Sequence, residues 1–173
     1  ENLLDVFKES IETDEFKKFQ EDFNESENIF FIGNGGCHSV ATHAASDVCR
    51  LTDKKCYALD NPSYLTSIAN DYGYNNIFMR WFEDYAMKNT NSMVIGFSGS
   101  GGSKNVISTL SFANDKYDFK TCLLSGQKSQ SLPEYINEVC FNNRYFHVHE
   151  ILCMLTFYQL VHATGNHCPT IKD

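Results

Sequence analysis

The chain has little of what marks disordered, membrane-spanning or nucleic-acid-binding proteins. Its 173 residues include only three prolines and no low-complexity tract, which argues against a disordered linker. Its apolar runs are shorter than the ~18–20 residues of a membrane span, so we expect no membrane contact. It has no basic run and a net charge of −8. Since the nucleic-acid backbone requires a cationic footprint, we expect no direct nucleic-acid partner.

The sequence also has no C-x-x-C pair, and its seven cysteines are an odd number. They are scattered through apolar stretches, where a thiol packs as a small hydrophobic group. This pattern favours a protein with reduced thiols over one stapled by disulfides, and we therefore expect a cytoplasmic location.

Apolar material, in contrast, is ample for a core. Hydrophobic residues make up 42% of the chain and aromatic residues 14%, including fourteen Phe and nine Tyr. Because a chain of this length is typical of one domain, we expect residues 1–173 to form a single domain.

Strand-like and helix-like stretches alternate along the chain. We expect strands at residues 28–32, 56–59, 93–97, 119–124 and 139–141, and helices at residues 2–24, 37–51, 64–70, 75–88, 104–113 and 147–164. Such alternation predicts an α/β fold in which a parallel sheet carries helices on both faces. Ligands of these sheets bind at the carboxyl ends of the strands.

Two glycine-rich loops follow predicted strands, and each leads into a predicted helix. The first loop is residues 33–37 (Gly-Asn-Gly-Gly-Cys), and the second loop is residues 98–103 (Ser-Gly-Ser-Gly-Gly-Ser). A strand that turns into a helix in this way leaves backbone N–H groups at the positive end of the helix dipole, where phosphate binds. Glycine lets the backbone approach a ligand, and serine adds hydroxyl donors. Together, the loops predict a pocket for a phosphorylated small molecule.

A dinucleotide-binding fold is an alternative for the first loop. Gly33, Gly35 and Gly36 follow a strand, and Asp60 ends the next strand at about the distance of a ribose-binding acid. The third glycine of G-x-G-x-x-G is missing, however, and the second loop would have no role, so we disfavour this alternative. A P-loop is excluded because no G-x-x-x-x-G-K-[ST] occurs.

Four segments carry a resemblance to a known family. Residues 32–38 (Ile-Gly-Asn-Gly-Gly-Cys-His) resemble the first loop of the sugar isomerase (SIS) domain, in its phosphoheptose isomerase branch. Residues 97–106 resemble the phosphate loop of that branch, residues 68–74 its segment with a pocket-lining acid, and residues 124–126 the end of its fourth strand.

The resemblance implies a three-layer α/β sandwich with a five-stranded parallel sheet flanked by helices. It also implies a homotetramer whose pockets lie at subunit interfaces. The implied reaction is the aldose–ketose isomerisation of sedoheptulose 7-phosphate through an enediol. The implied phosphate or substrate contacts are Asn34, Gly35, Gly36, Cys37, Asp71, Ser98, Gly99, Ser100 and Ser103.

The catalytic positions depart from the family pattern. His43 and Asp47 share one helical face, where the family has a histidine and a glutamate, so Asp47 is the candidate base and both are candidate metal ligands. Phe146 and Met154 fall where the family has a glutamine and a histidine, and neither can move a proton or is a plausible zinc ligand. We expect no required cofactor, because zinc at His43 and Asp47 would have an incomplete ligand set.

Two hypotheses follow. The leading one is a phosphoheptose isomerase-like protein that binds a phosphorylated sugar with an altered catalytic set. The alternative is a non-catalytic SIS domain that serves as a sugar-phosphate sensor or a protein-interaction adaptor, which Phe146 and Met154 favour.

Overall fold

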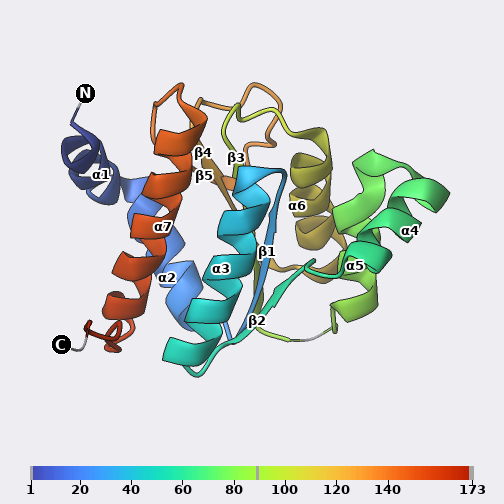
Figure 1. The fold of residues 1–173 in the computed structure, drawn as a ribbon, viewed down its shortest axis with the longest axis horizontal. Helices are drawn as coiled ribbons and strands as arrows, with labels where there is room; N and C mark the ends of the chain where they lie inside the picture. Colours follow the sequence, from blue (N-terminus) through green and yellow to red (C-terminus); the bar gives the residue numbers. More distant parts are fainter. Residues whose placement is uncertain (1, 89, 172–173) are drawn as a thin grey trace.

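A parallel sheet with the strand order β2-β1-β3-β4-β5 forms the middle layer of the molecule (Figure 1). The computed structural model describes residues 2–88 and 90–171. The strands are β1 (Asn28–Gly33), β2 (Lys55–Ala58), β3 (Ser92–Ser98), β4 (Lys120–Ser125) and β5 (Asn137–Cys140). All neighbouring strands pair in parallel. This confirms the α/β class and the five-stranded parallel sheet that the resemblance implied.

Helices cover both faces of the sheet (Figure 1). One face carries α1 (Leu3–Ile11), α2 (Asp14–Glu25), α3 (Gly36–Leu51) and α7 (Phe146–Ala163), and the other carries α4 (Pro62–Tyr72), the 3-10 helix η1 (Tyr74–Asn76), α5 (Ile77–Tyr85) and α6 (Lys104–Tyr117). Because side chains alternate along a strand, Phe31 packs into the first core and Phe30 into the second. Within the described residues, no helix combines the length and apolarity that crossing a membrane demands.

Our prediction of a single N-terminal helix at residues 2–24 is wrong. The structure has two helices there, separated by Glu12 and Thr13. Thr13 caps the second helix, because its Oγ1 accepts a hydrogen bond from the Phe16 N–H at 3.2 Å, and it donates to the Ser10 carbonyl of the first helix at 2.7 Å. The apolar spacing continues across this break, so periodicity alone does not reveal it.

The other predicted elements are present, with shifted ends. Helix α4 begins at Pro62 because the Asn61 side chain accepts hydrogen bonds from two backbone N–H groups of its first turn. Helix α6 continues to Tyr117, after which Asp118 adopts a left-handed conformation with φ 56°.

The sheet changes winding direction between β1 and β3. These strands are neighbours, but α3 follows β1 onto one face and α6 follows β3 onto the other. Such a reversal leaves a crevice at the carboxyl ends of the two strands, which is where ligands bind in open α/β sheets. The first and second loops follow β1 and β3 at this point, so the prediction that both lie on one edge of the sheet is confirmed.

Candidate functional site

Ser98 and Ser103 close the second loop on itself. Their hydroxyl oxygens lie 2.8 Å apart, and the Ser103 N–H donates to the Ser98 Oγ at 3.2 Å. Inside this ring, the Gly101 N–H donates to the Ser98 carbonyl at 3.0 Å and the Gly102 N–H donates to the Ser100 Oγ at 3.2 Å. The loop is thus a tight arrangement of hydroxyls and amides at the start of α6.

The N-terminus of α6 lacks the groups that usually neutralise a helix dipole. Among the described residues its N-cap, Ser103, makes no side-chain capping bond, and its first turn contains no acid. The first residue of the helix, Lys104, is exposed and basic. A positive helix end flanked by serine hydroxyls suits a phosphate group.

Asn34 joins the first loop to the second. Its side-chain amide exchanges two hydrogen bonds with that of Asn105 in α6, both at 2.9 Å, and its Oδ1 also accepts from the Tyr74 hydroxyl at 2.9 Å. Asn105 is buried, and sequence reasoning missed it. The available signal was an asparagine inside a predicted helix, where this residue is unfavourable unless its amide has partners. The Tyr74 bond also holds the segment of the exposed Asp71 near the first loop.

The first two turns of α7 cover both loops. Gly99 lies against the ring of Phe146, such that an added Cβ would meet a ring carbon at 2.8 Å. Gly36 lies against Glu150, and a Cβ there would overlap the Oε1 atom of Glu150. A carboxylate of the chain itself therefore faces the N-terminal turn of α3, which carries no acid and no side-chain cap within the described residues.

Burial governs the titration of the groups beneath the loops. It raises the pKa of the Cys37 thiol, so this buried side chain packs as a small group and is not activated as a thiolate. His149 is 1% exposed, and its Nε2 lies 3.6 Å from the Cys153 sulfur. Burial lowers the pKa of His149 to about 4. His147, two residues before His149 on the same helix, is exposed.

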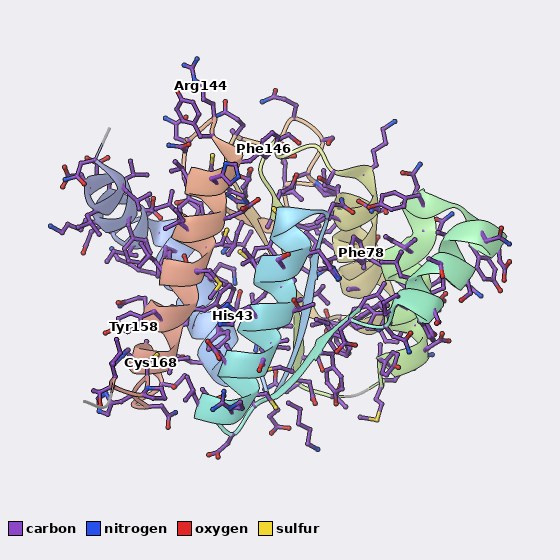
Figure 2. All side chains as sticks on the ribbon, in the orientation of Figure 1. His43, Phe78, Arg144, Phe146, Tyr158 and Cys168 are labelled. Atoms are coloured by element: carbon purple, nitrogen blue, oxygen red, sulfur yellow. The ribbon has the colours of Figure 1, made fainter. Side chains whose placement is uncertain are left out.

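His43 and Asp47 lie further down α3. Their Nε2 and Oδ2 atoms are 3.1 Å apart, and their side chains are 60% and 38% exposed. With 1.5 Å of rise per residue, Asp47 lies about 16 Å along the helix from Gly36. Figure 2 shows His43 part way along α3, whereas Phe146 lies near the loops. Within one chain, the structure does not bring Asp47 to the second loop.

No family model matches the chain, but individual relatives do. The phosphoheptose isomerase of Helicobacter pylori strain Shi470 is 41% identical over 105 residues, which cover 57% of this chain and 53% of that protein. That of Helicobacter pylori strain P12 is 35% identical over 133 residues, which cover 73% and 65%. The chain thus spans between about half and two thirds of the length of these relatives.

The solved structure of phosphoheptose isomerase from Neisseria gonorrhoeae matches with a TM-score of 0.82 and 21% identity, over 94% of this chain and 92% of that one. The chain is a SIS-fold relative of the phosphoheptose isomerases. The resemblance inferred from the loop motifs is thereby confirmed.

The positions at which this phosphoheptose isomerase relative would hold zinc do not fit the metal. Met154 of α7 lines a groove together with Asp47, and it offers a thioether where zinc takes His, Cys or a carboxylate. Phe146, the other departure, lies on Gly99. Across residues 2–88 and 90–171, no group of three or more His, Cys, Asp or Glu is placed to hold a metal ion.

Proposed function

We propose that the protein binds a phosphorylated sugar in the crevice between the first and second loops and isomerises it between aldose and ketose forms. The observation that carries this proposal is the second loop, where two serine hydroxyls and the N-terminus of α6 converge. The names of the relatives support a heptose phosphate as the substrate, and the resemblance of the loops implies sedoheptulose 7-phosphate.

Asp47 is the base in this proposal. Isomerisation through an enediol needs one group to remove the proton next to the carbonyl and another to return a proton to the neighbouring carbon. The Asp47 carboxylate is paired with the His43 imidazole, which gives two groups for these transfers on one exposed helix face. Asp47 lies far along α3 from the second loop of its own chain. A second copy of the chain would therefore bring its Asp47 to the sugar.

A homotetramer with pockets between subunits is part of the proposal. Helix α7 supports it, because Phe146, Ile151 and Tyr158 are large apolar side chains that are 64%, 48% and 55% exposed. A cytoplasmic location is also part of the proposal, since a reducing compartment suits the seven free thiols.

A non-catalytic sugar-phosphate sensor or adaptor is the second candidate. The specific observation in its favour is that Phe146 and Met154 provide no proton donor near the loops or beside Asp47. Binding without turnover would then be the function of the same crevice.

Deuterium incorporation distinguishes the two candidates. The protein is incubated with sedoheptulose 7-phosphate in deuterated water, and exchange at the two carbons that form the enediol is followed by NMR. Exchange that disappears in Asp47→Asn supports the isomerase, with Asp53→Asn as the matched control on the exposed surface. Tight binding without exchange supports the sensor.

Direct binding tests the site itself. Calorimetry with the sugar phosphate should give a Kd that weakens about tenfold or more in Ser98→Ala, because the buried Ser98 hydroxyl no longer closes the second loop through Ser103. A wild-type protein that binds neither the sugar phosphate nor inorganic phosphate would overturn both candidates.

A further inference from the structure

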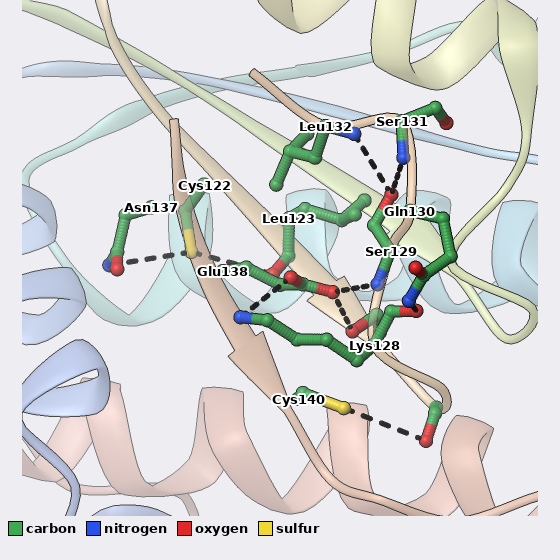
Figure 3. Close-up of polar contacts among 12 residues, drawn as sticks. Cys122, Leu123, Lys128, Ser129, Gln130, Ser131, Leu132, Asn137, Glu138 and Cys140 are labelled. Atoms are coloured by element: carbon green, nitrogen blue, oxygen red, sulfur yellow. Dashed lines mark hydrogen bonds and ion pairs between the residues drawn. The ribbon is translucent and has the colours of Figure 1, made fainter. Parts of the chain in front are cut away.

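Glu138 of β5 is a buried carboxylate with three hydrogen-bond donors (Figure 3). Its Oε1 accepts from the Ser125 hydroxyl at 2.7 Å and from the Ser129 N–H at 2.8 Å. Its Oε2 lies 2.9 Å from the Lys128 ammonium. A buried carboxylate is stable only when its oxygens are satisfied in this way, so these donors and Glu138 hold one another in place.

Two of the donors stand at the ends of one turn. Ser125 is the last residue of β4 and Ser129 follows four residues later, so one carboxylate oxygen ties both ends together. We call residues 125–129 the bracing turn. The Lys128 side chain is 64% exposed and reaches Glu138 through a long flexible stem, so it constrains the backbone of the turn less than the Ser125 hydroxyl and the Ser129 N–H do. The bonds from Ser125 and Ser129 therefore set the shape of the turn.

The backbone of the bracing turn hydrogen-bonds to the second loop. The Gly126 N–H donates to the Ser98 carbonyl at 3.3 Å, and the Gln127 N–H donates to the Gly99 carbonyl at 3.1 Å. In a planar trans peptide the N–H points opposite to the C=O. Since the turn fixes these two carbonyls, it directs the N–H groups of Gly99 and Ser100 away from itself.

Close packing adds a third contact between the turn and the loop. Gly101, with φ +68°, lies so near the turn that an added Cβ would overlap the Gln127 carbonyl oxygen and meet the Ser129 nitrogen at 3.0 Å. A displacement of the turn would therefore be transmitted to the second loop, because no space separates them.

We infer that Glu138 is a positioning residue for phosphate binding: through Ser125 and Ser129 it shapes the bracing turn, and the turn orients the amides of the second loop. The inference rests on the proposed function, since the second loop is the phosphate site proposed above. Glu138 touches no ligand itself and acts through the turn.

Calorimetry with inorganic phosphate and with sedoheptulose 7-phosphate tests this inference at a temperature where circular dichroism shows every variant to be folded. Glu138→Leu removes both turn contacts and should weaken both Kd values about tenfold or more. Glu138→Gln keeps an acceptor oxygen and should restore binding to within about threefold. Lys128→Met removes only the exposed partner and should change the Kd less than about twofold.

Two further variants make the result decisive. Ser125→Ala removes one small donor and should weaken binding about threefold to tenfold, so it decides the matter if Glu138→Leu does not fold. Glu83→Leu is the matched control, because Glu83 is also a carboxylate held by side chains of its own chain, in this case Arg80 and Lys116 on α5 and α6, away from the loops. It should lower the melting temperature and leave the Kd unchanged.

Wild-type binding separates the possible failures. If the wild-type protein binds phosphate and both Glu138→Leu and Ser125→Ala bind it equally well, the inference is wrong and the proposed function stands. If the wild-type protein binds neither ligand, the proposed function fails and the inference fails with it.

Discussion

The first and second loops share one strand–loop–helix arrangement, but different side chains of α7 contact them. Each follows a buried strand, each opens a helix, and within the described residues neither helix has a side-chain cap or an acid in its first turn. The first loop is met by the Glu150 carboxylate at Gly36. The second loop is met at Gly99 by the ring of Phe146, which carries no charge. A strand–glycine–helix pattern therefore leaves an anion site only where the chain does not supply its own anion.

Among the substitutions that test this difference between the loops, we expect replacement of Gly101 in the second loop to have the largest effect on stability and phosphate affinity. Gly101→Ala should destabilise the fold by about 2–4 kcal/mol, because it combines a strained φ of +68° with an overlap on the Gln127 carbonyl. The loop must shift to relieve this overlap, so phosphate affinity should fall about 100-fold or more. Urea unfolding and calorimetry with inorganic phosphate measure the two effects.

Gly35→Ala in the first loop is the control for strain alone. Gly35 has φ +58°, but an added Cβ would meet no described atom within 4 Å. Because ψ is −125°, this backbone lies outside the left-handed helical region, and we expect a cost of about 1–3 kcal/mol with only a small change in phosphate affinity. If Gly35→Ala weakens phosphate binding more than Gly101→Ala does, the second loop is not the phosphate site.

The buried His149 beneath the second loop predicts a pH dependence of stability. Its pKa is about 4 in the folded protein and near its ordinary value of 6.5 in the unfolded chain. Below pH 6.5 the unfolded chain binds a proton that the folded protein does not bind until about pH 4. The stability that this histidine supports is therefore complete above pH 6.5 and is lost as the pH falls towards 4, by about 2–3 kcal/mol at pH 4.5.

Urea unfolding at pH 7.5 and pH 4.5 measures this loss. His149→Leu should show a smaller drop in unfolding free energy between the two pH values than the wild-type protein. His147→Leu, at an exposed position on the same helix, should keep the wild-type drop. Equal drops in all three proteins would show that His149 is not desolvated as described.

The sequence predicts the two loops because their signals are local. Glycine and serine after an apolar strand need no knowledge of the rest of the chain, and the parallel sheet then places both loops at one edge. The Thr13 cap was missed although it is also local, because the helical periodicity continues across it. The pairing of Asn34 with Asn105 joins the first loop to helix α6, and these two segments follow different strands, so only the fold reveals it.

The side chains that contact the loops are brought there by the packing of one element against another, so the sequence predicts them less well. Glu150 and Phe146 reach Gly36 and Gly99 only because α7 packs beside α3, and no local pattern encodes that register. Glu138 precedes the strand that we predicted at residues 139–141, where a carboxylate would ordinarily face solvent, but the structure places it inside β5. Its burial follows from the donors that the bracing turn brings to it.

The smallest expected change in phosphate affinity comes from removing the charge of Glu150, the side chain that contacts the first loop. The Glu150 carboxylate faces the start of α3, and the two loops end neighbouring strands about 4.8 Å apart, so its charge opposes a phosphate that approaches the second loop. Glu150→Gln keeps the size of the side chain and removes the charge. We expect inorganic phosphate to bind about two- to fivefold more tightly at low salt, and the gain to shrink in 0.5 M salt because of screening.

Calorimetry at two salt concentrations measures this gain, and Glu9→Gln provides a variant with the same net charge at an exposed site on α1. An equal gain in both variants would mean that net charge alone is responsible. Weaker binding of the sugar phosphate by Glu150→Gln would reverse the interpretation, because the carboxylate would then be accepting hydrogen bonds from the sugar. In that case the first loop would bind the sugar hydroxyls and the second loop would bind the phosphate, both within one pocket.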